Sequence, residues 1–350
     1  MTTPAGPSKI VCATDFSPNA DAALRWAATT AAAPGDSIDL VTVVSPPAAS
    51  FVDLAMDASV LDAARIRLAT ERLEDLAGTT ERALGISVTP YVLAGSPPRA
   101  IVEHAESAKA RLLVLGARSR ALLDRPILGS VAERTVRISS RPVAVVPHAD
   151  PSRRSPGHRL RVLVGLEGGV AGDRALALVR DLRRTRTCDV TVLHLYWPIA
   201  EYQRLGLQGS RDLFTGDPDV IRNLEPDLRQ RIGDFPGQGS FELAIRPAWG
   251  DPAANLLAAA DEGDYELLIV GAERRHGLAR FAHPSVSQRL ARRTEGVVVI
   301  CVPPPAVAPA PVIADAPPRL WLAILDRHEA PLRRPPCGGG IVHRPRSQPS

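Results

Sequence analysis

Apolar and polar positions alternate in blocks along the chain, and the blocks have two lengths. Short runs rich in Val, Ile and Leu are followed by longer segments in which apolar residues recur with helical spacing. Such runs, without strict alternation, are typical of strands buried on both faces of a parallel sheet. In the first half the pattern predicts strands at residues 9–14, 38–44, 86–93, 112–115 and 143–146, and helices at 19–33, about 56–84, 97–108 and 130–139.

The same order of blocks occurs twice. The apolar run that ends at Asp15 recurs as the run that ends at Glu167, and the run that ends at Gly116 recurs as the run that ends at Gly271. The spacing between matching blocks stays between 152 and 155 residues. A near-constant spacing over several blocks indicates a tandem duplication of one folding unit.

Strand–helix alternation with right-handed crossovers builds a doubly wound sheet. We therefore expect an α/β protein with two tandem, doubly wound, parallel five-stranded sheets. The expected domains cover residues 1–148 and 159–303 and are joined by a linker at 149–158. The remaining segment, 304–350, is rich in proline, which is typical of disordered chains, although its apolar stretch at 320–325 is a candidate for docking.

Residue types near the ends of the predicted helices indicate where each helix begins and stops. Asn19 and Ser130 are good N-cap types, because their short polar side chains accept hydrogen bonds from free backbone N–H groups. Gly35 and Gly85 are expected to end the helices before them.

The long helix expected at 56–84 has no equally long equivalent in the second half. In the first half, one apolar stripe is predicted along this helix, at Leu61, Ala64, Leu68 and Leu76. The matching part of the second half is interrupted by glycine and proline, so a shorter helix near 221–232 is expected there.

Composition places the chain among globular proteins. Apolar residues make up 45% and charged residues 23%, which excludes a wholly disordered or collagen-like chain. The net charge of +4 falls mostly after residue 305, so the folded body lacks the basic surface expected of a nucleic-acid-binding protein. The four cysteines show no CxxC spacing, which argues against a metal site and favours reduced thiols in the cytoplasm. No signal peptide or membrane span is expected.

The strongest local motif combines Gly116, Arg118 and Ser119 with a second group, Gly129, Ser130 and Val131, after nine intervening residues. A Gly-Ser pair that opens a helix presents free backbone N–H groups, a hydroxyl and the positive end of the helix dipole, which together favour a phosphate. A glycine at a strand end lets backbone approach a ligand closely.

Two side chains on the neighbouring strands complete this group. Asp15 is placed to accept hydrogen bonds from a ribose or to hold a metal ion bound to phosphates, and Val43 is placed to pack against a base. These residues meet at the switch point of a doubly wound sheet, where ligands bind. A purely structural interpretation stays open at this point, with Gly116 as a turn residue, Gly129 and Ser130 as an ordinary helix cap, and Asp15 as the cap of the helix that follows it.

These residues also resemble a known family. The segment Ala13-Thr14-Asp15-Phe16-Ser17, the stretch 127–134 and the stretch 142–147 are similar to those of the universal stress protein family, and the chain resembles a tandem of two such domains over about 9–147 and 160–303. The resemblance implies a stress-response role and an ATP site, with Mg²⁺ as an optional companion of the nucleotide. Carried over residue by residue, it implies contacts to adenosine and phosphates from Thr14, Asp15, Val43, Gly116, Ser119, Gly129, Ser130 and Val131, with Arg118 a further candidate for the phosphates.

Both halves depart from the family motif. In the first half Ser119 stands where the motif has its second glycine. In the second half Glu167 and Leu195 stand where Asp15 and Val43 stand, Arg274 replaces a glycine, and Pro284 removes a backbone donor from the expected phosphate site. We therefore expect the second half to be a structural partner that binds no ATP, with a different anionic ligand held by its arginines as an open alternative.

Three functional hypotheses remain. The first is a nucleotide-dependent switch, without catalytic residues, that acts on an unknown protein partner. The second is a nucleotide-free scaffold of the same fold. The third is an enzyme of the same fold, such as a ligase or an electron-transfer flavoprotein, but the sequence offers neither a nucleophile motif nor a flavin loop. In each case the flat apolar strands at 143–146 and near 297–302 are expected to pair, either within one chain or between two chains.

Overall fold

The computed structural model describes residues 8–45, 58–117, 129–147, 158–207, 216–271, 289–290 and 298–302. All of them belong to one unit, Met1–Pro305. The expected linker, except for its last residue His158, and the proline-rich segment 304–350 lie outside the described residues.

Each half alternates strands and helices. The first half contains β1 (Lys9–Ala13), α1 (Pro18–Trp26), the π-helix η1 (Ala27–Ala31), β2 (Ser37–Val44), α2 (Ala58–Leu84), β3 (Ser87–Ala94), α3 (Pro97–Ser107), β4 (Leu112–Gly116), α4 (Ser130–Ile138) and β5 (Val143–Val146). The second half contains β6 (Leu160–Gly165), α5 (Val170–Thr185), β7 (Cys188–Tyr196), α6 (Pro198–Leu205), α7 (Pro218–Ile232), β8 (Phe241–Pro247), α8 (Pro252–Glu262), β9 (Leu267–Gly271) and β10 (Val298–Val302).

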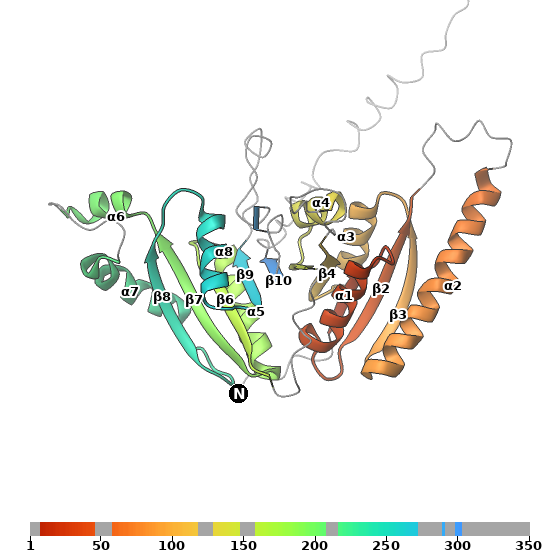
Figure 1. The fold of residues 1–350 in the computed structure, drawn as a ribbon, viewed down its shortest axis with the longest axis horizontal. Helices are drawn as coiled ribbons and strands as arrows, with labels where there is room; N and C mark the ends of the chain where they lie inside the picture. Colours follow the sequence, from red (N-terminus) through yellow and green to blue (C-terminus); the bar gives the residue numbers. More distant parts are fainter. Residues whose placement is uncertain are drawn as a thin grey trace, which may run out of the picture. The chain divides into compact units, whose positions relative to one another are not determined.

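The strands form one ten-stranded sheet in the order β3-β2-β1-β4-β5-β10-β9-β6-β7-β8, with β3 and β8 at its outer edges (Figure 1). Within each half all neighbouring strands are parallel, and β1 and β6 lie at the switch points between two crossover directions. The expected fold class is therefore confirmed. The halves join through β5 and β10, which pair antiparallel with Val299 opposite Val145. This pairing covers two short apolar strand edges that water would otherwise meet.

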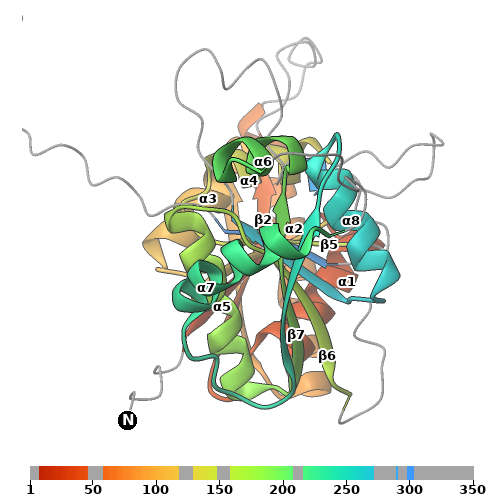
Figure 2. The same cartoon turned by 90° about the vertical axis from the view of Figure 1, so that its left-hand side faces the viewer.

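Helices cover both faces of the sheet. One apolar cluster lies between the sheet and α1, α2, α5 and α7, and the other lies between the sheet and α3, α4 and α8. Figure 2 shows this arrangement in the second half, where α5 and α7 lie on one side of β6 and β7 and α8 lies on the other. Because both faces are buried, the strands need apolar residues at nearly every position, which explains their continuous Val, Ile and Leu runs.

Two of the predicted N-cap residues are wrong by one or two positions, although α4 starts at Ser130 as predicted. Ser17, rather than Asn19, caps α1, because its Oγ accepts a hydrogen bond from the Ala20 N–H and Pro18 takes the first helical position. The cap of α4 is Gly129, and Ser130 is the first helical residue. Asn19 is buried within the first turn of α1 instead.

Of the two predicted helix ends, the one at Gly85 is confirmed and the one at Gly35 is wrong. Gly85 directly follows α2 with a φ of 68°, a left-handed conformation that glycine adopts without strain. Gly35 does not end a helix, since the helical segment stops at Ala31 after the π-helical turn, and Gly35 belongs to the turn before β2.

The apolar stripe predicted for α2 is wrong in its amino-terminal part. Ala64 is exposed and Leu68 is 66% exposed, whereas Leu73 and Ala77 are buried and Leu76 is half-buried; the burial of Leu61 lies outside the described residues. The cause is length. A helix of 27 residues extends about 40 Å, whereas the eight-residue strands β2 and β3 extend about 26 Å. The first turns of α2 therefore have no sheet beneath them.

The second half has two shorter helices where the first has α2. The helix expected near 221–232 is confirmed as α7, which starts three residues earlier at Pro218, where Asp217 caps it through the Asp219 N–H. The additional helix α6 was not predicted, and it ends at Gly206, which has a φ of 65°.

The π-helix η1 is a contact point between the halves. Arg186, the residue after α5, donates a hydrogen bond to the carbonyl oxygen of Thr29 in η1. Arg111, just before β4, donates to the carbonyl oxygen of Ala31 over 2.9 Å. The wide turn of a π-helix leaves carbonyl groups available to such donors, so two arginines satisfy the end of this element.

A buried carboxylate ties three segments together near the amino ends of the strands. Asp36 accepts hydrogen bonds from the Ser8 N–H and hydroxyl, both over 2.8 Å, and from the Ala33 N–H over 2.9 Å. The Arg111 guanidinium lies 2.8 Å from its second oxygen. Burial by itself raises the pKa of the Asp36 carboxyl, but these hydrogen bonds and the guanidinium charge outweigh it and hold that pKa below its usual value.

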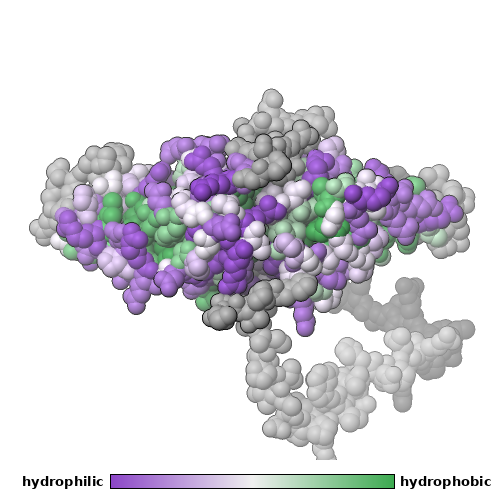
Figure 3. All heavy atoms as spheres, turned by 90° about the horizontal axis from the view of Figure 1, so that it is seen from below, coloured by the Kyte–Doolittle hydropathy of each residue, from purple (hydrophilic) through white to green (hydrophobic). Residues whose placement is uncertain are grey.

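No helix within the described residues is long and apolar enough to cross a membrane. The face shown in Figure 3 is largely hydrophilic, with hydrophobic residues gathered in separate areas.

The lowered pKa of Asp36 predicts an acid-dependent part of stability. Because the pKa is lower in the folded state, this contribution is present above about pH 4, the unfolded value, and is lost as the pH falls through the folded value. We expect Asp36→Asn to reduce the free energy of unfolding by about 1–3 kcal/mol at pH 7. The difference from wild type should shrink between pH 5 and about pH 2 in urea titrations. The exposed Asp75→Asn is the control, and an equal deficit of Asp36→Asn at every pH would contradict the assignment.

Candidate functional site

The carboxyl ends of β1, β2 and β4 meet at the switch point of the first half. Strands β1 and β4 are neighbours with Cys12 opposite Val114, and β2 lies on the other side of β1 with Val41 opposite Ala13. The N–H of Thr14 continues this ladder with a 2.8 Å hydrogen bond to the Val41 carbonyl. Thr14, Val43 and Gly116 therefore come from three neighbouring strand ends, as predicted.

The turn after β1 is held by its own side chains. Thr14 Oγ1 accepts a hydrogen bond from the Phe16 N–H over 2.9 Å, and Asp15 Oδ1 accepts one from the Ser17 N–H over 3.0 Å. Phe16 has a φ of 60°, which is uncommon for a residue with a side chain. The Asp15 side chain is exposed, and its second oxygen has no hydrogen-bond partner among the described residues. The turn thus leaves one carboxylate oxygen exposed beside the carboxyl ends of the strands.

Gly116 is required by packing, independently of any ligand. A Cβ atom at this position would lie 2.7 Å from the backbone C and O of Asn19 and 2.9 Å from the N of Ala20. The first turn of α1 therefore lies directly against the end of β4. Gly271 has the same role in the second half, where a Cβ would lie 3.1 Å from the backbone of Ala171 and Gly172. The presence of this glycine in both halves is consequently no sign of a ligand in either.

The second part of the motif opens α4. Gly129 is its cap and makes no side-chain hydrogen bond, Ser130 is exposed, and Val131 is half-buried. The start of this helix thus has N–H groups for which the cap supplies no side-chain acceptor. Glu133 adds a negative charge in the first turn, which sequence reasoning did not consider and which opposes an anion there. Arg118 and Ser119 lie outside the described residues.

Val43 and Val131 share one apolar cluster. Both are half-buried and pack against the cluster that includes Leu115, Ala117 and Ala132. The sheet face covered by α3 and α4 therefore offers apolar contact area at the carboxyl ends of the strands.

The corresponding turn of the second half is built differently. Gly169 caps α5 with a φ of 92° and no side-chain hydrogen bond, where the first half has the Ser17 cap. Arg231 from α7 lies against this turn, with its Nη2 2.6 Å from the Gly169 carbonyl and its Nε 2.8 Å from Asp173 Oδ1. Glu167 is exposed and Leu195 is half-buried. Arg274 and Pro284 lie outside the described residues.

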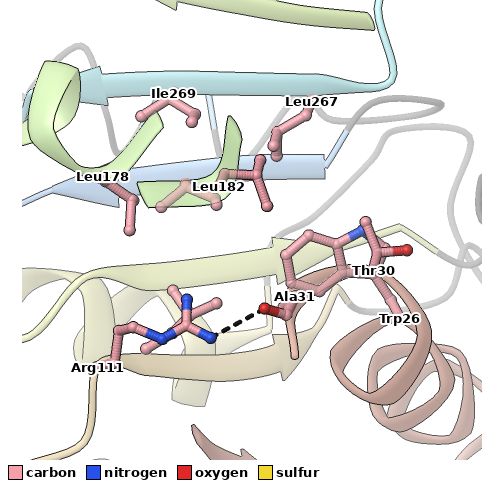
Figure 4. A pocket seen from close by; sticks show the side chains of 10 residues that line it. Trp26, Thr30, Ala31, Arg111, Leu178, Leu182, Leu267 and Ile269 are labelled. Carbon is pink, nitrogen blue, oxygen red and sulfur yellow. Dashed lines mark hydrogen bonds between the residues drawn. The ribbon is translucent and has the colours of Figure 1, made fainter. Parts of the chain in front are cut away.

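A cavity between α1–η1 and α5 is too small to hold a cofactor. Its lining includes Trp26, Thr30, Arg111, Leu178 and Leu182, and Figure 4 shows the Arg111 guanidinium bound to the Ala31 carbonyl at its edge. The cavity volume is ≈ 20 Å³, which holds about one water molecule. Cofactor pockets measure about 300–1,000 Å³, so this space is a packing gap at the junction of the halves.

An ion pair with a buried carboxylate, which the sequence did not predict, joins β1, β2 and α3. Asp39 on β2 is buried, with His104 Nε2 2.9 Å from one carboxylate oxygen and Lys9 Nζ 3.3 Å from the other. The Tyr91 ring lies against the imidazole with ring centres 4.5 Å apart. The three groups hold α3 to the sheet. Among the described residues, no group of three or more His, Cys, Asp or Glu side chains is arranged to hold a metal ion.

Known proteins with similar sequences and folds agree with this architecture. A family model described as the universal stress protein family matches residues 7–147 and again 158–302. A universal stress protein of Mycolicibacterium smegmatis is 28% identical over 300 residues, covering 84% of this chain and 97% of that protein. One of Mycobacterium tuberculosis is 25% identical over 299 residues, covering 83% and 95%. Among solved structures, a universal stress protein from Archaeoglobus fulgidus superposes with a TM-score of 0.62 at 20% identity, covering 84% of this chain and 98% of that one.

The close approach at Gly116 predicts a sharp difference between two glycine substitutions. Gly116→Ala places a methyl group against backbone that cannot yield, so we expect a loss of about 1–3 kcal/mol in the free energy of unfolding. Gly78→Ala on α2 has no atom within 4 Å of the new Cβ, and the better helix propensity of alanine should add about 0.5–1 kcal/mol. Urea denaturation of both variants measures the difference. Wild-type stability of Gly116→Ala would contradict the packing role.

Proposed function

Because the chain belongs to the universal stress protein family, we propose that it binds ATP in its first half and acts as a ligand-dependent switch in a stress response. The Asp15 carboxylate accepts hydrogen bonds from the ribose hydroxyls, and Thr14 holds the turn that carries it. Val43 and Val131 pack against the base. Gly129 and Ser130, at the start of α4, contact the phosphates through backbone N–H groups and a hydroxyl, with Gly116, Arg118 and Ser119 as the remaining proposed contacts.

The observation that carries the proposal is the turn at Asp15. Its backbone is fixed by three side-chain acceptors, on Thr14, Asp15 and Ser17, and it leaves one exposed carboxylate oxygen unused. A turn already fixed in its ligand-binding shape loses little conformational entropy on binding, which favours affinity. The cap of α4 and the apolar surface under Val43 supply the other two chemistries that a nucleotide needs.

The structure of the second half favours one nucleotide site in the whole chain, in the first half. There the turn after β6 has no side-chain cap, and Arg231 occupies its carbonyl at Gly169. We propose that this half binds no ATP and serves as the structural partner of the first. A switch with one site needs no turnover, so the proposed role assigns no catalytic residue to the chain. Mg²⁺, where it accompanies ATP, would be bound mainly by the triphosphate and water.

The proposal places the protein in the cytoplasm, where thiols stay reduced. Cys12, Cys188 and Cys301 are buried and are not joined to one another by disulfides. Burial raises the pKa of these thiols to about 12, 11 and 12, so they stay protonated and unreactive.

One observation favours a nucleotide-free scaffold as the second candidate. Glu133 places a negative charge in the first turn of α4, at the end of the helix where phosphates should bind. A negative side chain already stabilises a helix start electrostatically and weakens its attraction for a second anion. The scaffold would act through its surface alone, and titration with ATP separates the two candidates.

The decisive variant is Gly129→Asp, examined by calorimetric titration with ATP and Mg²⁺. Gly129 has a φ of −56°, which every residue type adopts, and Asp is a favourable N-cap. The variant should therefore fold with unchanged or higher stability. Its carboxylate competes with phosphate for the same N–H groups, so we expect one-site binding to wild type and at least a ten-fold weaker affinity in the variant.

The matched control is Gly78→Asp, which adds the same charge on α2 at a position without neighbours. It should bind ATP as wild type does. Absence of binding to wild type would leave the scaffold as the better function, and equal binding by Gly129→Asp would remove α4 from the site.

A further inference from the structure

The turn at Asp15 is also held from outside, by a side chain of the long helix. The guanidinium carbon of Arg72 on α2 lies 4.4 Å from the centre of the Phe16 ring. The Phe16 ring is half-buried and packs against the apolar cluster under α1 and α2. Leu73, the next residue along α2, is fully buried and anchors the helix at this level. Arg72 therefore covers the one residue of the turn whose backbone is in an uncommon conformation.

Among the described residues, Arg72 has no acidic partner. Its side chain is exposed, and within the described part of the chain no carboxylate lies within 4 Å of it. Arg67, five residues earlier on α2, pairs with Glu71. The aromatic face of Phe16 is thus the principal contact of the Arg72 guanidinium, a stabilising cation–π arrangement.

The second half places an arginine at the same point by other contacts. Gly168 stands where Phe16 stands, so there is no ring to cover. Arg231 on α7 bonds directly to the Gly169 carbonyl and to Asp173 in the first turn of α5. The two helices differ in length, 27 against 15 residues, and yet both direct an arginine onto the turn after the first strand of their half. Two different local solutions with the same result indicate that this turn needs an external support.

We propose that Arg72 is a positioning residue for the nucleotide site, holding the Phe16 turn so that the Asp15 carboxylate faces the ribose. The inference rests on the proposed function and adds to it a link between α2 and the site. Arg72 acts through the turn and does not touch the nucleotide. Its effect on affinity should therefore be the same for ATP and for adenosine, since both carry the ribose.

The test compares Arg72→Met, which keeps the apolar stem, with Phe16→Leu, which keeps apolar volume and removes the aromatic face. Calorimetric titration with ATP and Mg²⁺, and separately with adenosine, should show a two- to five-fold weaker affinity for each variant, about the value of an exposed cation–π contact. The double variant should be no weaker than either single one, because both remove one shared contact. Arg72→Lys should retain part of the affinity.

The control is Arg67→Met, whose side chain is 79% exposed and does not reach the turn. It should leave both affinities unchanged. The variant Asp15→Asn tests whether Arg72 acts through the Asp15 carboxylate. In a protein that already carries Asp15→Asn, the added change Arg72→Met should no longer weaken adenosine binding. A merely structural role of Arg72 would lower the melting temperature and leave this comparison additive.

The outcomes separate the two proposals. Absence of ATP and adenosine binding to wild type overturns the proposed function together with the role of Arg72. Binding to wild type with unchanged affinity in Arg72→Met overturns the positioning role alone. A loss seen for ATP but not for adenosine also overturns it, because Arg72 would then act on the phosphates directly.

Discussion

The close approach of a helix start to a strand end governs both halves of this protein. At Gly116 and at Gly271 the first turn of a helix lies so near the sheet that a side chain would meet backbone atoms. This contact sets how far α1 and α5 can stand from the sheet and forces the chain between strand and helix into a tight turn. The halves stabilise that turn differently: the first with the side chains of Thr14, Asp15 and Ser17, the second with glycine and an arginine from α7.

The fold could be predicted from the sequence because its signals are local and repeated. Continuous Val, Ile and Leu runs mark strands buried on both faces, and the recurrence of whole blocks marks the duplication. The errors have physical causes that the type or spacing of a single residue does not show. Leu68 fits a helical stripe by spacing, but the sheet beneath α2 ends before it. Asn19 is a good cap by residue type, but Pro18 and Ser17 already begin the helix.

The candidate site was predicted in part. The strand ends at Thr14, Val43 and Gly116 meet as expected, since parallel strands bring their carboxyl ends to one edge. The sequence assigned Gly116 to a ligand, and only the distance to Asn19 shows its packing role. Arg72, Arg231 and the Asp36–Arg111 pair join residues distant in sequence, so no local pattern could identify them. Arg118 and Ser119 remain predictions of the sequence alone.

Because the two halves belong to one chain, their association does not depend on the concentration of the protein. When strands such as β5 and β10 belong to separate chains, their pairing depends on protein concentration and can be reversed by dilution. Here they belong to one chain and pair with each other, so the local concentration of one strand near the other is fixed by the connecting segment. The abundance of this protein can therefore rise or fall many-fold without altering how its two halves associate. The proposed switch would therefore have to act through a change of shape, because monomer–dimer exchange at this seam is not available to it.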